Sequence, residues 1–219
     1  MPSRPLPVVH NPEVDVAAPP LRLDPERALA GLSWSEVFGR EAPVEVEVGI
    51  GKGRFLLAAA AARPDVDHLG IEWANEYLRI AETRAAKRGL RNLRFVRADA
   101  KLLVARAIPD ASVSAYYVFY PDPWPKKRHH KRRFFDRATV DRVVATLVPG
   151  GWLHAATDHD DYWEVMEPLL DGTPGLRRQP AFAGPAFPLP AEGALTNFEA
   201  KYEVEGRSRH RGTWRREGA

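Results

Sequence analysis

A glycine-rich turn between positions 47 and 53 is the first segment whose residue types suggest chemistry, because Glu47 precedes Gly49, Gly51 and Gly53. Glycines let the backbone approach a ligand closely where a strand leads into the N-terminus of a helix. The spacing is G-x-G-x-G, whereas dinucleotide sites use G-x-G-x-x-G. This spacing disfavours a dinucleotide oxidoreductase, and the acid favours a cationic ligand without a pyrophosphate. Helix–strand packing is the alternative reason for such glycines.

Two further acids, Glu72 and Asp99, end the next two apolar runs. In parallel sheets, ligands bind at the carboxyl ends of the strands, so these positions face the same site as Glu47. Glu72 is placed to accept hydrogen bonds from ribose hydroxyls, and Asp99 from an adenine amino group. A helix N-cap is the alternative role of Asp99. Three acids in corresponding places favour a nucleoside with a cationic group, such as S-adenosylmethionine.

The segment from Tyr120 to Pro125 places Asp122 and Trp124 between prolines. Prolines cannot continue a hydrogen-bonded ladder, so the preceding strand must end and a rigid loop must project from the sheet. The loop therefore holds Asp122 in place. Trp124 offers a flat face on which a nucleobase can stack.

A basic strip over residues 126–133 follows this loop, with six cations in eight residues. A charge run is usually a solvated face, but a basic run beside a stacking tryptophan is typical of phosphate binding, which depends strongly on salt. No acid, cysteine or third histidine has metal-ligand spacing to the histidines of the strip, so we predict no metal site. The members of the strip are Lys126, Lys127, Arg128, His129, His130, Lys131, Arg132 and Arg133.

Short apolar runs alternate with amphipathic stretches along the chain, a pattern typical of an α/β fold with a mostly parallel central sheet and helices on both faces. Residues 1–25 are rich in proline and are expected to form an extended, partly disordered N-terminal arm. Residues 26–219 are expected to form a single domain. The predicted strands cover 44–48, 68–71, 93–96, 113–120 and 152–156, and extra strands are expected near 176–179 and 200–204, one of them an antiparallel edge. The predicted helices cover 25–32, 53–62, 74–88, 100–107, 134–147 and 160–170.

Composition sets few limits on the partner. The net charge is only +3, from 32 Lys and Arg against 29 Asp and Glu, so the position of the charge says more than its sum. Cysteine is absent, which excludes disulfides, thiolate metal sites and cysteine nucleophiles. No membrane-spanning run or signal peptide is recognisable, so we expect a cytoplasmic protein without a membrane partner.

With these motifs in view, the sequence resembles the bacterial tRNA (guanine-N7-)-methyltransferase family from about Val44 to about Glu205. The most specific string is Pro-Asp-Pro-Trp-Pro-Lys-Lys-Arg-His-His-Lys-Arg-Arg, which begins at Pro121. The resemblance implies a Rossmann-like class I methyltransferase fold. It also implies methyl transfer from S-adenosylmethionine to N7 of the tRNA variable-loop guanosine at position 46. The products would be 7-methylguanosine and S-adenosylhomocysteine. We expect a monomer or homodimer without an obligate protein partner or a metal.

The resemblance also implies roles for individual residues. It makes Asp122 both a cofactor contact and the catalytic acid, adds Lys126 and Asp158 as substrate contacts, and makes residues 128–133 an RNA-interacting stretch. From the residues alone, Asp158 would be a helix N-cap and Thr196 with Glu199 a capping box. The cofactor contacts expected are Glu47, Gly49, Gly51, Glu72, Asp99 and Asp122, and the late substrate contacts are Thr196, Asn197, Phe198 and Glu199.

Two other functions stay open at this stage. The loop at Asp122 also resembles that of adenine amino-group methyltransferases, although it reads Asp-Pro-Trp-Pro and lacks their Asn/Asp-Pro-Pro-aromatic order. A non-catalytic RNA-binding protein on the same fold is the third possibility, which the intact acids at 47, 72, 99 and 122 oppose. Measured binding of S-adenosylmethionine would separate a methyltransferase from a non-catalytic RNA-binding protein.

Overall fold

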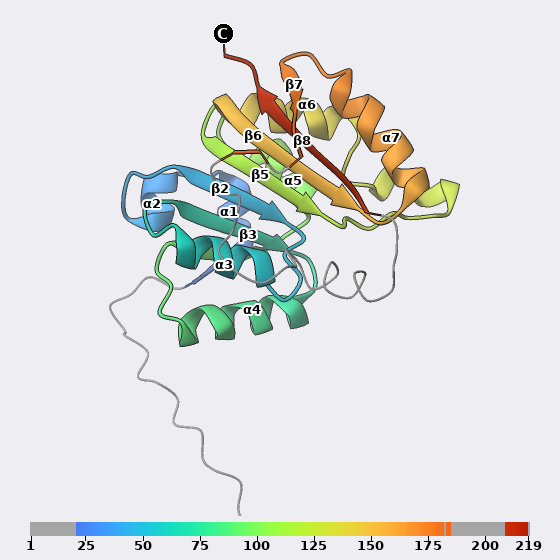
Figure 1. The fold of residues 1–219 in the computed structure, drawn as a ribbon. Helices are drawn as coiled ribbons and strands as arrows, with labels where there is room; N and C mark the ends of the chain where they lie inside the picture. Colours follow the sequence, from blue (N-terminus) through green and yellow to red (C-terminus); the bar gives the residue numbers. More distant parts are fainter. Residues whose placement is uncertain (1–20, 182, 185–208, 219) are drawn as a thin grey trace, which may run out of the picture.

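The computed structural model describes residues 21–181, 183–184 and 209–218. They contain an eight-stranded sheet in the order β1-β4-β3-β2-β5-β6-β8-β7 (Figure 1). The strands are β1 (Arg22–Leu23), β2 (Val44–Val48), β3 (Asp67–Glu72), β4 (Leu93–Arg97), β5 (Val113–Phe119), β6 (Leu147–Thr157), β7 (Leu176–Gln179) and β8 (His210–Arg216).

The strand order reverses next to β2, since the chain runs outward from β2 through β3 and β4 and then returns to β5 on the other side. The pairs from β1 to β6 are parallel, so β2, β3, β4 and β5 all end on the same side of the sheet. We call this row of strand ends the carboxyl edge of the sheet. Such a switch point is where open α/β sheets bind ligands. The predicted α/β fold with a mostly parallel sheet is therefore confirmed.

Helices cover both faces of this sheet (Figure 1). Helices α3 and α4 pack on one face, while α1, α5, α6 and α7 share a larger apolar core with the opposite face. No helix among the described residues is long and apolar enough to cross a membrane. The α-helices are α1 (Pro25–Ala30), α2 (Trp34–Phe38), α3 (Arg54–Ala62), α4 (Asn75–Lys87), α5 (Ala100–Arg106), α6 (Arg137–Thr146) and α7 (Asp160–Asp171), and η1 (Lys127–Arg132) is a 3-10 helix.

The structure differs from the sequence-based prediction mainly at the late strands. The antiparallel strand is β8, which lies between β6 and β7 and not at the edge. The arginines of β8 indicate an exposed segment, but Trp214 among them is fully buried against α7. The predicted strand near 176–179 is confirmed as β7, and the one near 200–204 lies outside the described residues.

Three further differences concern the ends of elements. The strand predicted over 152–156 is longer than expected, because β6 begins at Leu147, where the predicted helix 134–147 was to end, and its register against β5 shifts before Trp152. Helix α2 was not predicted. At the end of the predicted arm, β1 pairs in parallel with β4. Elsewhere the predicted strands and helices match the observed ones to within a few residues.

Candidate active site

The turn after β2 has the backbone that its glycines suggest. Gly49, Gly51 and Gly53 have φ values of +73°, +52° and +75°, a region that side chains rarely adopt. A Cβ on Gly53 would lie 2.9 Å from the Cβ of Ala81, so packing explains this glycine. Among the described residues, nothing lies within 4 Å of a Cβ built on Gly49 or Gly51. Packing therefore does not explain these two, and the space beside them is open to a ligand.

Glu47 is a buried carboxylate on the α3 side of β2. Its side chain is 3% exposed, and within the described part of the chain its Oε2 atom has no hydrogen-bond partner. Burial raises the pKa of Glu47 well above its ordinary value. The charge of Glu72 adds to the rise, and the backbone N–H of Leu56 offsets only part of it. An ionised group in such a place needs a cation beside it.

Glu45, two residues earlier in the same strand, shows what a compensated carboxylate looks like here. It is equally buried, but Arg63 donates to its two oxygens at 2.6 and 2.5 Å and Tyr117 donates at 3.0 Å. The protein thus pairs the buried Glu45 of β2 with an internal cation, whereas Glu47, beside the glycine turn, has no such partner among the described residues.

Glu72 connects the glycine turn with the start of α4. Its Oε2 atom accepts a hydrogen bond from Gly51 N–H at 2.9 Å, and its Oε1 atom accepts from Ala74 N–H at 2.8 Å. A carboxylate can accept about four hydrogen bonds, so these two leave acceptor capacity for ribose hydroxyls. Glu72 therefore shapes the turn and stands beside Gly51.

Asp99 follows β4 and caps α5. Its Oδ1 atom accepts from Leu102 N–H at 3.2 Å, so the N-cap role considered from the sequence is confirmed. The side chain is exposed at the edge where β4 ends. Capping uses one carboxylate oxygen and is compatible with a contact to an adenine amino group through the other.

The loop that carries Asp122 leaves β5 in a strained conformation. Tyr120 and Trp124 have φ values of +53° and +44°, which is rare for residues other than glycine, and such strain clusters at functional sites. Tyr120 N–H donates to Ala156 O of β6 at 2.7 Å, which fixes the start of the loop. Asp122 itself is exposed at the edge where β2, β3 and β4 end.

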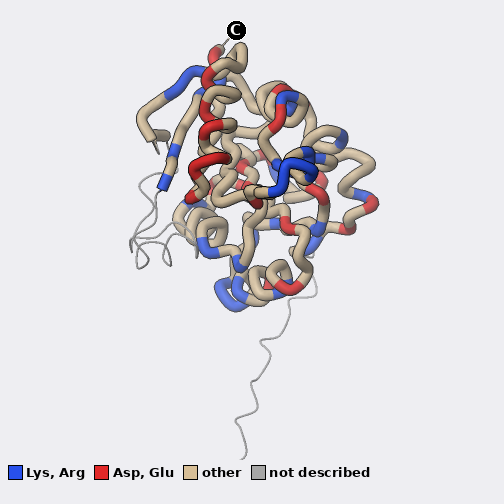
Figure 2. Tube along the Cα trace, turned by 90° about the vertical axis from the view of Figure 1, so that its right-hand side faces the viewer, with Lys and Arg blue, Asp and Glu red and all other residues tan. Residues whose placement is uncertain are grey.

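The basic strip forms η1 directly after this loop, and Figure 2 shows it as a blue stretch of the tube. Trp124 does not present a bare ring, since the guanidinium of Arg132 lies 4.9 Å from its centroid and His129 meets it edge-on at 5.8 Å. Lys126, Lys127, Arg128, Lys131 and Arg132 are exposed. These five cations form the part of the strip that a polyanion can reach.

Arg133, the last cation of the strip, is buried. It is 5% exposed, its Nε atom donates to Pro123 O at 2.7 Å, and its guanidinium lies 4.6 Å from the ring of Tyr162. Lys101, which the sequence did not single out, donates to the carbonyls of Lys131 and Arg133 at 3.3 and 3.1 Å. No pattern in the sequence marks either contact, because both join distant segments.

The remaining predicted contacts are only partly described. Asp158 lies half-buried between β6 and α7, and the N-cap of α7 is His159, so the alternative interpretation of Asp158 as the N-cap was wrong. The predicted contacts Thr196, Asn197, Phe198 and Glu199 lie outside the described residues. No cluster of three or more potential metal ligands occurs in the described part of the chain.

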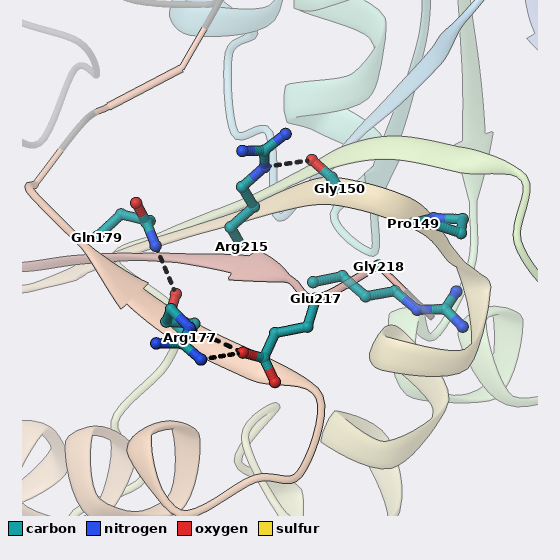
Figure 3. A pocket seen from close by; sticks show the side chains of 8 residues that line it. Pro149, Gly150, Arg177, Gln179, Arg215, Glu217 and Gly218 are labelled. Carbon is teal, nitrogen blue, oxygen red and sulfur yellow. Dashed lines mark hydrogen bonds and ion pairs between the residues drawn. The ribbon is translucent and has the colours of Figure 1, made fainter.

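A basic hollow of about 570 Å³ lies at the opposite end of the strands, where β6 begins (Figure 3). Gly150 at the start of β6 accepts from Arg215 at 3.1 Å, and Arg177 is paired with Glu217. Because β2, β5 and β6 begin at this end, the hollow is separate from the glycine turn and from Asp122.

Two solved methyltransferases share this architecture. The chain matches an antibiotic-related methyltransferase with a TM-score of 0.57 and 18% identity, over 85% of this chain and 96% of that one. It matches the aminoglycoside resistance methyltransferase NpmB1 with a TM-score of 0.56 and 19% identity, over 83% and 91% of the two chains. At this level of identity the likeness shows the fold alone, a Rossmann-like class I methyltransferase fold.

Sequence relatives place the chain more narrowly. The family model described as "Putative methyltransferase" matches residues 41–211. A tRNA (guanine-N(7)-)-methyltransferase of Chromohalobacter salexigens is 42% identical over 80% of this chain and 71% of its own length. One from Mycolicibacterium paratuberculosis is 39% identical over 89% and 74%. The chain belongs to the tRNA (guanine-N(7)-)-methyltransferase family.

Proposed function

We propose that this protein transfers a methyl group from S-adenosylmethionine to N7 of guanine in tRNA, at the variable-loop guanosine of position 46. The observation that carries the proposal is one edge of the sheet, where an uncompensated buried acid lies beside an open glycine turn and Asp122 stands next to the basic strip. The named activity of relatives up to 42% identical supports the same reaction.

The residues present fit S-adenosylmethionine. Glu47 offers a buried carboxylate to a cationic ligand, Gly49 and Gly51 leave open space, and Glu72 and Asp99 offer acceptors for ribose and adenine. When bound, S-adenosylmethionine supplies an electrophilic methyl group on a sulfonium. No metal has a role in this proposal.

The chemistry asks little of a base. Guanine N7 has an in-plane lone pair and no proton, so its lone pair forms the new N–C bond while the S–C bond breaks and its electrons stay on sulfur. The protein's task is alignment, which lowers the barrier by fixing the two reactants. The purine becomes cationic, so the Asp122 carboxylate stabilises the charge that develops on the ring.

The substrate side of the proposal rests on the exposed cations of the basic strip, which bind tRNA phosphates, and on Lys126, Asp158 and residues 196–199 as substrate contacts. In the folded tRNA, N7 faces the major groove, where tertiary contacts can engage it, so we expect the base to be displaced into the site beside Asp122. Such a protein acts where tRNA is made and used, which agrees with the cytoplasm expected from the sequence.

The test is methyl transfer from labelled S-adenosylmethionine to unmodified tRNA transcripts, followed by nucleoside analysis. Label in 7-methylguanosine is the expected result. Label in a methylated adenosine would instead favour an amino-group methyltransferase, and cofactor binding without any transfer would favour a binding protein on the same fold. The variant Asp110→Asn, at an exposed acid paired with Arg142, serves as a control expected to behave as wild type.

A further inference from the structure

The basic strip is not a single exposed surface, because Arg132 points to the solvent and Arg133 points into the core. Arg132 is exposed and lies over the ring of Trp124, whereas Arg133 is buried and donates to the carbonyl of Pro123. A buried guanidinium cannot also pair with a phosphate at the surface. Arg133 therefore needs an explanation other than RNA binding.

The contacts of Arg133 tie the Asp122 loop to the core. Its Nε–H holds Pro123 O at 2.7 Å, one residue after Asp122, and its guanidinium packs on Tyr162 of α7. Tyr162 is itself fixed, since its hydroxyl oxygen accepts from Phe135 N–H at 3.1 Å and its side chain is fully buried. The loop is thus held at both ends, by Tyr120 N–H before Asp122 and by Pro123 O after it.

Lys101 joins this arrangement to the cofactor side. It stands two residues after Asp99, at the start of α5, and its ammonium donates to the carbonyls of Lys131 and Arg133. It also forms an ion pair with Asp136, whose other oxygen caps α6 by accepting from Thr139 N–H at 2.8 Å. The segment after η1 is thereby fastened to the helix that Asp99 caps.

We infer that Arg133 and Lys101 are positioning residues that hold Asp122 in register with the cofactor edge, and that Arg133 makes no contact with tRNA phosphates. The chain of contacts runs from α5 through Lys101 to the backbone of Arg133, and from the Arg133 guanidinium to Pro123 beside Asp122. This inference rests on the proposed role of Asp122. A loss of these contacts should affect turnover and leave tRNA binding in place, because positioning errors of about 1 Å cost catalysis.

The test compares Arg133→Gln with Lys131→Gln, an exposed neighbour in the same strip. For each variant, kcat, KM for tRNA, the salt dependence of tRNA binding, the Kd for S-adenosylmethionine and Tm are measured. Arg133→Gln is expected to lower kcat by about 10- to 100-fold with the salt slope unchanged. Lys131→Gln is expected to raise KM for tRNA and lower the slope by about 0.9, with a smaller effect on kcat than Arg133→Gln. Arg133→Lys should recover part of kcat, because its ammonium can still donate to Pro123 O.

Lys101→Gln is the second variant, in case Arg133→Gln does not fold. Lys101 is only half-buried, and its loss should lower kcat by about 3- to 10-fold with the same salt slope. A reduced salt slope with normal kcat in Arg133→Gln, or normal kcat in Lys101→Gln, would overturn the inference. Asp122→Asn measured in parallel separates the two proposals: normal turnover there contradicts the role of Asp122, whatever the positioning variants do.

Discussion

Glu47 is a buried carboxylate without a cationic partner among the described residues, an environment that favours binding of a cationic ligand. Because burial raises the pKa of Glu47, the folded protein holds a proton that the unfolded chain releases near pH 4.5. The contribution of Glu47 to the stability of the cofactor-free protein should therefore fall as pH rises above 4.5, up to the raised pKa. This contribution is measured as the difference between wild type and Glu47→Gln, because the lowered pKa values of the buried His68 and His154 make their own contributions rise over the same range. Glu47→Gln should abolish this dependence and raise the free energy of unfolding near neutral pH by about 1 kcal/mol, roughly 2–4 °C in Tm.

The same substitution should weaken cofactor binding. An ionised Glu47 attracts the cationic cofactor, so calorimetry should show that wild-type affinity increases with pH and that Glu47→Gln removes this increase. Glu45→Gln is the matched control in the same strand. It leaves Arg63 without its carboxylate and should lower the free energy of unfolding by about 3 kcal/mol. Equal effects of the two substitutions on stability would contradict the contrast drawn between them.

Asp122 is the residue on which catalysis should depend most. Asp122→Asn keeps the size of the side chain and removes the charge that, in the proposed mechanism, faces the developing cationic purine. We expect kcat to fall by about 100-fold, since electrostatic groups at a reacting centre contribute about 100- to 1,000-fold, with KM for tRNA nearly unchanged. Steady-state kinetics at saturating cofactor would check this. A rise in KM with normal kcat would mean that Asp122 only binds the substrate.

The glycine turn makes a prediction about an element. Gly53→Ala combines a positive φ with a Cβ contact of 2.9 Å to Ala81, whereas Gly49→Ala has the positive φ but open space. Denaturant unfolding should therefore show a loss of about 2–3 kcal/mol for Gly53→Ala and about 1 kcal/mol for Gly49→Ala. If Gly49→Ala binds the cofactor as well as wild type, the open space beside Gly49 does not accommodate the ligand.

The exposure of the basic strip could be predicted from its sequence only in part. The run of six cations predicts a basic surface, and five of them are exposed. Its composition does not reveal that Arg133 turns inward, because the ring that receives it, Tyr162, lies 29 positions later in the chain. Likewise, no strand was predicted over the residues of β8, since its burial depends on pairing with β6 and on packing against α7.

At the scale of the whole molecule, the parallel part of the sheet was predictable because short, buried strands rich in valine, leucine and isoleucine alternate along the chain with amphipathic helices. The strand order then brings Glu47, Glu72, Asp99 and Asp122 to one edge, as expected from the positions of the acids after their strands. Positions 196–199 lie outside the described residues, so their role as substrate contacts stays a prediction.

The basic hollow lies far from the basic strip and provides a control for the position of the tRNA-binding surface. Arg128 belongs to the exposed strip, whereas Arg177 lies on β7 at the hollow and is paired with Glu217. Arg128→Gln should lower the salt slope of tRNA binding by about 0.9, and Arg177→Gln should leave it unchanged. Filter binding over a range of salt concentrations would decide, and an equal decrease in both variants would show that the tRNA also contacts the basic hollow.

The most direct test of the central claim changes one atom of the substrate. A tRNA transcript with 7-deazaguanosine at position 46 has a C–H group in place of N7 and is otherwise the same molecule. We predict that it binds the protein as the unmodified transcript does but accepts no methyl group from labelled S-adenosylmethionine, while the unmodified transcript accepts one. Equal transfer to both transcripts would contradict methylation of N7 at this guanosine.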